Sequence, residues 1–274
     1  MRANVFFTQG QSTAAHQFWS GAIAMLVGSF SRLTVRQCRN STTAVRQMSS
    51  FFHGSRPAMH LVDGVRFRCT GLFYDWRADR ADFAKRAILE IFRDDQPAPG
   101  ADSNPDAIVV MMNPGSSAPL AGYGQPEFAG QRVPAKPDAV QYQVMRLMAA
   151  AGWQHARVVN LADVRAAKSA DLYALIESGA TPADLGAMFA GASFVPTQAA
   201  VTAPRVICAW GMDKRLAPYA RQAQAWLDAQ GITPLGVQAT TSTFPAYRYP
   251  KPVGNWNMAV EWLATLKAQV GIGG

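Results

Sequence analysis

Short apolar runs alternate with longer stretches of helical periodicity along most of the chain. The run 107–112 (AIVVMM) is continuously apolar, which is typical of a strand buried on both faces of a sheet. Similar short runs, each a predicted strand, lie at 157–161, 206–210 and 234–237. Stretches with apolar residues at helical spacing, each a predicted helix, lie at 138–151, 169–178, 182–190, 213–230 and 256–270. The alternation predicts a three-layer α/β/α fold with a central, mainly parallel four-stranded sheet.

The region before the first of these strands has a different pattern. Residues 65–74 (VRFRCTGLFY) alternate between polar and apolar side chains, which predicts a hairpin-like edge element. Residues 79–92 carry apolar side chains at helical spacing, with two aspartates near the start, which predicts a helix. The turn-forming residues of 94–106 (DDQPAPGADSNPD) then predict a linker.

Residues 1–58 differ from the rest of the chain in composition. They contain six arginines and no acidic residue, so they carry +6 of the formal net charge of +8. We expect a flexible extension, or a start codon placed too early with Met48 or Met59 as the true beginning, ahead of a single domain over 59–274. A signal or transit peptide is the alternative, although the apolar run 18–30 is too short to span a bilayer. The remaining charge of the body is only a weak indication of a nucleic-acid partner.

Several classes of function are disfavoured by what the sequence lacks. The three cysteines and four histidines show no spacing of a disulfide framework or a metal site. We therefore expect no metal and no cofactor, no membrane span, and a monomer in a reduced, cytoplasmic setting. A Walker-type loop, a strand-end Gly-x-Gly-x-x-Gly and a Gly-x-Ser-x-Gly are also absent from the sequence. Nucleotide hydrolysis, dinucleotide chemistry and Ser/Cys triad hydrolysis are disfavoured accordingly.

Polar side chains follow the predicted parallel strands at their carboxyl ends, where ligands bind in open α/β sheets. Asn113 comes directly after the first strand and begins the run Asn-Pro-Gly-Ser-Ser, and Asn160 stands near the end of the second. The loop 240–252 after the fourth strand is rich in Thr, Ser, Tyr and Arg. Asn113 is either a functional amide at the rim of the sheet or a residue that only forms the turn.

The motifs at these strand ends resemble those of one superfamily. The sequence MNPGSSAPLAGYG resembles the strand-end motif of the uracil-DNA glycosylase superfamily, especially its mismatch-specific branch. The sequence VVNLADVR resembles the strand motif that places a base-reading Asn in the family-one uracil glycosylases. Together with AWG and a closing loop of Tyr and Pro, these motifs are similar to a bacterial family of unassigned function with the same fold. The resemblance covers about residues 105–270 and implies a uracil-DNA glycosylase-like fold.

The resemblance implies a monofunctional DNA glycosylase, a hydrolase that removes a flipped base from DNA and leaves an abasic site. By this resemblance Asn113 positions the attacking water, Asn160 reads the edge of the base, and Tyr123 or Phe128 stacks on it. An amide holds a water but does not take its proton, so we expect slow turnover. The residues expected to contact DNA are Ser116, Ser117, Arg165, Lys168, Ser242, Arg248 and Lys251.

The last loop departs from the superfamily pattern, in which His-Pro or Asn-Pro begins the final motif. This loop (TSTFPAYRYP) has no histidine to stabilise the leaving base, and Arg248 or a tyrosine hydroxyl is the candidate replacement. Phe244 or Tyr247 is the candidate wedge into the duplex. The departure disfavours plain uracil, and the long, Gly-rich loop 115–136 favours a bulkier modified base, such as those of phage DNA. The alternatives are a non-catalytic nucleic-acid-binding protein of the same fold and a hydrolase of free nucleosides or nucleotides.

Overall fold

The computed structural model describes residues 58–76, 83–100, 102–186, 205–250, 254 and 256–272. They all belong to one unit, Ser55–Gly274. The expected extension, apart from its last residue, lies outside the described residues, as does Lys251.

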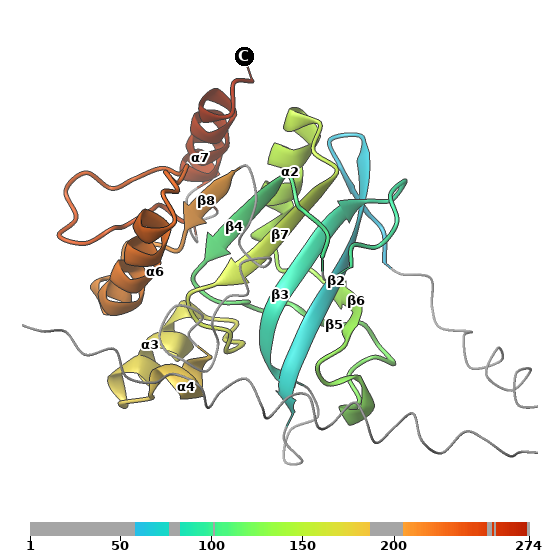
Figure 1. The fold of residues 1–274 in the computed structure, drawn as a ribbon, viewed down its shortest axis with the longest axis horizontal. Helices are drawn as coiled ribbons and strands as arrows, with labels where there is room; N and C mark the ends of the chain where they lie inside the picture. Colours follow the sequence, from blue (N-terminus) through green and yellow to red (C-terminus); the bar gives the residue numbers. More distant parts are fainter. Residues whose placement is uncertain are drawn as a thin grey trace, which may run out of the picture. The chain divides into compact units, whose positions relative to one another are not determined.

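A mixed sheet forms the centre of the described part of the chain (Figure 1). Its strands are β1 (His60–Val62), β2 (Val65–Trp76), β3 (Phe83–Arg93), β4 (Ala107–Met111), β5 (Ala118–Pro119), β6 (Arg132–Lys136), β7 (His155–Asn160) and β8 (Val206–Ala209). Their order is β5-β6-β2-β3-β7-β4-β8, with β1 beside β2. The sheet therefore joins segments that lie far apart in the sequence.

Only the β7–β4–β8 part of the sheet is parallel. The other pairings of the named strands are antiparallel, so the prediction of a mainly parallel sheet is wrong. The reason is the long β2–β3 hairpin, which pairs with β7 and extends the sheet well beyond the predicted strands. The predicted strand 234–237 is reduced to a parallel bridge between Ile207 and Leu235.

The segment 79–92, predicted to be a helix, contains the strand β3 instead. Its apolar residues fit the period of a helix as well as that of a strand, because both faces of this strand are covered. Leu89 and Ile91 join one hydrophobic cluster, and Ile88 joins the other. Pairing with β2 and β7 on its two sides outweighs the local helical pattern. The neighbouring segment 65–74 is a strand as predicted, but it lies inside the sheet rather than at an edge.

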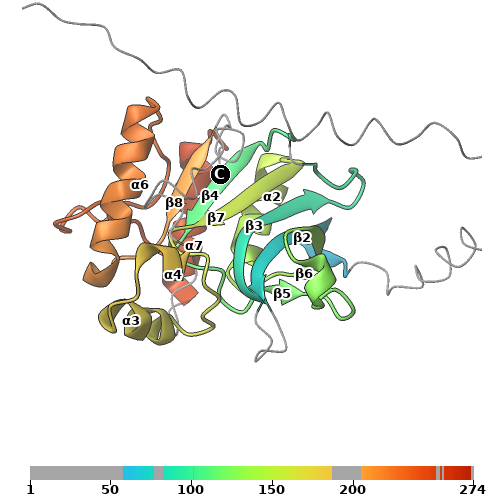
Figure 2. The ribbon, with the colours of Figure 1, turned by 60° about the horizontal axis from the view of Figure 1, so that its bottom comes forward.

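Helices cover both faces of the sheet, as the three-layer prediction requires (Figures 1 and 2). They are α2 (Gln141–Ala151), α3 (Ser169–Glu177), α4 (Pro182–Leu185), α6 (Ala217–Ala229) and α7 (Trp256–Gln269), with short 3-10 turns η1 (Pro126–Phe128) and η2 (Lys214–Leu216). The α2 face is covered by α2 and α7, which supply residues such as Val144 and Trp262 to its core. The α6 face is covered by α3, α4 and α6, which supply Leu172, Leu185 and Leu227. The protein is therefore an α/β protein.

No helix among the described residues is both long and apolar enough to cross a membrane.

Candidate active site

A cavity of about 710 Å³ opens at the carboxyl end of the parallel strands. Its walls come from the segments that follow β4, β7 and β8, from the start of α2, and from the loop before α7. The lining residues are Met112, Asn113, Gly115, Asp138, Ala139, Val140, Ala166, Ala167, Ser169, Tyr173, Trp210, Gly211, Met212, Tyr249 and Gly254. The predicted convergence of the loops after these three strands is therefore present.

Asn113 supplies a buried amide to this cavity, with only 2% of its surface exposed. Its Nδ2 donates to the backbone carbonyl of Ala166 at 2.8 Å, which ties the end of β4 to the segment after β7. In the part of the chain that the structure covers, no donor is bonded to its Oδ1. The amide is thus oriented by the protein and retains an acceptor for a water or a ligand.

Asp138 supplies a carboxylate to the same cavity and was not singled out from the sequence. Its Oδ2 accepts hydrogen bonds from the backbone N–H (2.7 Å) and the hydroxyl (2.8 Å) of Ser116, and its Oδ1 accepts from the backbone N–H of Val140 at 3.0 Å. Its own N–H donates to the side chain of Gln141. The spacing Asp-x-x-Gln ahead of α2 is that of a capping box, which is the signal that locates this carboxylate.

Gly115 allows the carboxylate to lie this close to the β4 loop. Its φ is +63°, in the left-handed region. A Cβ atom at this position would collide with Oδ2 of Asp138. The Gly of the Asn-Pro-Gly motif is therefore required by the approach of a residue 23 positions later in the sequence.

Three aromatic side chains, Tyr173, Trp210 and Tyr249, also line the cavity. The Arg215 guanidinium lies 4.0 Å from the centre of the Tyr173 ring and is bound by Asp213 and Glu177. Trp210 donates from Nε1 to the carbonyl of Pro245 at 2.8 Å. Tyr173 and Trp210 are therefore held by their neighbours. Because Trp210 is fully buried, the flat surfaces available to a ring-shaped ligand are those of Tyr173 and Tyr249.

Asn160, expected from the resemblance to read the edge of the base beside Asn113, does not line the cavity. The side chain is fully buried. Its Nδ2 donates to the backbone carbonyl of Arg86 at 3.4 Å, and its Oδ1 lies 3.5 Å from Nη2 of the same residue. The reason is register: Asn160 pairs with Met111, which places it inside the sheet and two residues short of Asn113.

Tyr123 and Phe128, the predicted stacking residues, are also absent from the cavity wall. They pack against each other, with ring centres 5.4 Å apart, and against the core of the α2 face. The three aromatic residues that line the cavity come from three other segments of the chain. The sequence pattern around Tyr123 and Phe128 holds no information on which distant segments meet at the cavity.

None of the predicted DNA-contacting residues that the structure describes lines the cavity. Ser116 is bonded to Asp138, and the Ser117 hydroxyl donates to the carbonyl of Lys136 at 2.8 Å. Arg165 donates to the carbonyl of Ser117 at 2.6 Å, and Arg248 pairs with Glu261 at 3.1 Å. Lys168 is exposed. The serine hydroxyls and the two arginines therefore already have partners within the protein.

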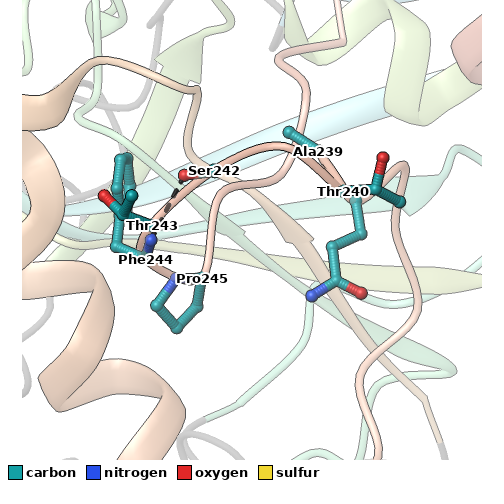
Figure 3. A pocket seen from close by; sticks show the side chains of 7 residues that line it. Ala239, Thr240, Ser242, Thr243, Phe244 and Pro245 are labelled. Atoms are coloured by element: carbon teal, nitrogen blue, oxygen red, sulfur yellow. Dashed lines mark hydrogen bonds between the residues drawn. The ribbon is translucent and has the colours of Figure 1, made fainter.

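Ser242 lies in a second hollow, of about 500 Å³, formed by the single loop 238–245 (Figure 3). Its Oγ accepts a hydrogen bond from the backbone N–H of Phe244 at 3.3 Å, drawn as a dashed line in the figure. Phe244 and Tyr247 are buried, with 9% and 6% of their surfaces exposed. Because both rings belong to the core of the α6 face, the prediction that one of them is an exposed wedge is wrong.

A buried polar group, the Arg86 cluster, lies at the carboxyl end of β7 and is formed by Tyr74, Arg86, Asn160 and Asp163. Burial raises the pKa of Asp163 to about 7, although the Tyr74 hydroxyl donates to its Oδ2 at 2.8 Å and the Arg86 charge is close. Burial lowers the pKa of Arg86 to about 10, so the guanidinium remains charged at neutral pH. Of its members, only Asn160 was predicted from the sequence to be a functional residue.

A second buried polar group, the Glu90 cluster, lies toward the amino end of β7 and consists of Glu90, Arg132, His155 and Arg157. Arg157 donates from Nε to both carboxylate oxygens of Glu90 at 3.0 and 3.1 Å, and His155 is bonded to the same carboxylate at 2.8 Å. Burial alone would raise the pKa of Glu90, but the His155 hydrogen bond and the Arg157 charge outweigh it, and the pKa is lowered.

Comparisons of the chain with family models, with curated proteins and with solved structures give no match. Within the residues that the structure describes, no three His, Cys, Asp or Glu side chains gather where they could hold a metal ion.

Proposed function

We propose that the protein is a DNA glycosylase that hydrolyses the N-glycosidic bond of a flipped, modified base and leaves an abasic site. The observation that carries the proposal is the cavity itself, in which an oriented amide, a carboxylate and three aromatic side chains line one space. The likeness of the Asn113 motif to the uracil-DNA glycosylase superfamily supports the same chemistry. A role against phage DNA that carries modified bases follows from the proposed substrate.

Asn113 and Asp138 divide the hydrolytic step between them. A water bound at Oδ1 of Asn113 attacks C1′ of the sugar as the C1′–N bond breaks and its electron pair leaves with the base. Asp138 accepts the proton of that water, which an amide does not do. The presence of this carboxylate removes the physical reason for expecting slow turnover from Asn113 alone.

The size and walls of the cavity support a substrate larger than an unmodified pyrimidine. Its volume of about 710 Å³ lies within the range of pockets that enclose whole small molecules. Tyr173 and Tyr249 provide the stacking surface that a base removed from the helix needs. Plain uracil would leave much of this space unfilled.

The test is release of base, measured by mass spectrometry, together with abasic-site formation on DNAs that carry different modified bases. Asn113→Ala and Asp138→Asn are each expected to lower the rate by at least about 100-fold, since each removes a group that acts in the transition state. Asn104→Ala, the same type of change at an exposed position, is the matched control and should retain full activity. Full activity in Asn113→Ala would contradict the proposal.

A second candidate, a hydrolase of free nucleosides, is favoured by one observation. None of the described residues that line the cavity is a Lys or an Arg, and the predicted phosphate contacts Arg165 and Arg248 have partners within the protein. A glycosylase that neutralises several phosphates must lose DNA affinity steeply as salt concentration rises. Salt-independent activity, with release of base from free nucleosides, would favour this second candidate.

A further inference from the structure

An irregularity in β3 decides which way Arg86 points. Leu72 of β2 pairs with Ile88, but the next residue, Phe73, pairs with Arg86, so Ala87 has no partner in β2. Cross-strand partners lie on the same face of a sheet, and Phe73 belongs to the core of the α2 face. In a regular strand Arg86 would lie on the same face as Ile88, which is the α6 face. Bulges of this kind re-aim side chains and are frequent next to active sites.

Among the described residues no carboxylate is bonded to the re-aimed guanidinium, although the charge of Asp163 acts on it. None of the Arg86 surface is exposed, and within the described residues its Nε and Nη1 have no hydrogen-bond partner. Its Nη2 reaches only Oδ1 of Asn160, at 3.5 Å. Burying a charge in this way is unfavourable unless something pairs with it, so such a group in a native protein requires an explanation.

The sheet contains a matched example of the structural alternative. Arg157 is also fully buried, but its guanidinium is bonded to the Glu90 carboxylate through Nε and Nη2 and to the carbonyl of Ser103. A buried arginine that serves only packing can therefore be satisfied within this sheet. Arg86 has no such carboxylate bonded to it among the described residues.

Arg86 is linked to the cavity wall through Asn160, whose Oδ1 lies 3.5 Å from Nη2 of Arg86 and whose partner in β4, Met111, is two residues before Asn113. The charges of Asp163 and Asp138 favour the protonated form of Arg86, against the effect of burial. Burial raises the pKa of Tyr249, and the Arg86 charge opposes that rise. Arg248, the sequence-based candidate to stabilise the leaving base, is bound to Glu261 instead.

We propose that Arg86 supplies positive charge to the floor of the cavity and makes the cavity favour a planar anionic ring. For the reaction, this inference rests on the proposed glycosylase function, in which that ring is the base leaving with the electron pair of the broken C1′–N bond. Arg86 transfers no proton; its charge stabilises the base anion through a region of low dielectric. It takes the place of the histidine that the last loop lacks.

The experiment compares two probes of nearly the same shape, using the full chain and isothermal titration calorimetry. Barbiturate is a planar anion at neutral pH, and uracil is its neutral counterpart. The wild type is expected to bind barbiturate at least about tenfold more tightly than uracil, the effect of one charge-assisted interaction. Arg86→Met should abolish this preference without lowering the affinity for uracil, and Arg86→Lys should retain part of it.

Arg157→Met is the matched control, because it removes an equally buried arginine from the same sheet. Its folded fraction should keep the preference for barbiturate. If Arg86→Met does not fold, Arg86→Gln removes the charge while keeping a donor toward Asn160, and the same loss of preference is expected.

Equal affinity of the wild type for the two probes, no measurable binding of barbiturate, or an unchanged preference in the Arg86 variants that lack the charge would overturn the inference. The proposed function fails separately. A protein that prefers barbiturate but releases no base from any DNA has the anion site without the glycosylase activity. A protein that releases base without this preference is a glycosylase whose leaving group is stabilised in another way.

Discussion

The Glu90 cluster and the Arg86 cluster occupy different positions on the same two strands, β3 and β7, and each contains a fully buried arginine. In the Glu90 cluster the guanidinium, the imidazole and the carboxylate satisfy one another. In the Arg86 cluster, Nε and Nη1 of Arg86 and Oδ1 of Asp163 have no partner among the described residues. The difference is one of satisfaction: the polar groups of the Glu90 cluster bond one another, whereas those of the Arg86 cluster retain unpaired atoms among the described residues.

The largest effect is expected when the satisfied cluster is broken. Glu90→Gln leaves Arg157 buried without its counter-ion, which should lower the free energy of unfolding by about 3 to 5 kcal/mol. Urea unfolding measures the loss. Asp95→Asn, which removes a carboxylate from an exposed pair with Arg93, is the control and should change stability by less than about 1 kcal/mol. A loss in Glu90→Gln as small as that of the control would remove the distinction between the two clusters.

The next effect is the pH dependence of stability. The contributions of Glu90 and Asp163 to the free energy of unfolding should change in opposite directions as pH changes. The folded-state pKa of Glu90 is lowered, so its contribution is present above the unfolded-state pKa and is lost as pH falls. The pKa of Asp163 is raised from 3.8 to about 7, so the folded state holds the proton more tightly. The contribution of Asp163 therefore decreases as pH rises from about 4 to about 7, by up to about 4 kcal/mol.

Asp163→Asn isolates this contribution, because it removes the titrating group and keeps a polar side chain of the same size. Urea unfolding at a series of pH values should show a flatter profile for the variant than for the wild type between pH 4 and pH 7. Parallel profiles for the two proteins would show that Asp163 titrates normally in the folded state.

The smallest effect on stability is expected at Arg86. Arg86→Met replaces an unpaired buried charge with an apolar side chain, so we expect no loss and a gain of up to about 2 kcal/mol. Thermal and urea unfolding measure it. A loss comparable to that of Glu90→Gln would mean that Arg86 is bonded in solution as Arg157 is, and the two clusters would then be alike.

The sequence predicted the elements whose pattern is local. The strands β4, β7 and β8 and the helices α2, α3, α6 and α7 lie where short apolar runs and helical spacing placed them. The prediction was wrong at β3, where the apolar residues fit a helix because both faces of the strand are buried. Pairing with β2 and β7 is a property of the tertiary fold, which a window of a single segment does not contain.

The same limit applies to the site. Asn113 was predicted because a polar residue directly after a buried strand is a local signal. Asp138 and Tyr249 reach the cavity from segments far along the chain, and only the capping spacing before α2 marks the first of them. Asn160 carried a similar local signal to Asn113 but ends inside the sheet, because the register with β4 decides which residue reaches the rim.

Ala87 matters to this molecule through its presence in the chain rather than through its chemistry. As an extra residue in β3 it lets Arg86 pair with Phe73 on the α2 face, whereas a strand in which Ala87 itself paired with Phe73 would carry Arg86 on the α6 face. A search for related proteins with the same site should therefore align the spacing between Arg86 and Ile88 before it compares the residues around them.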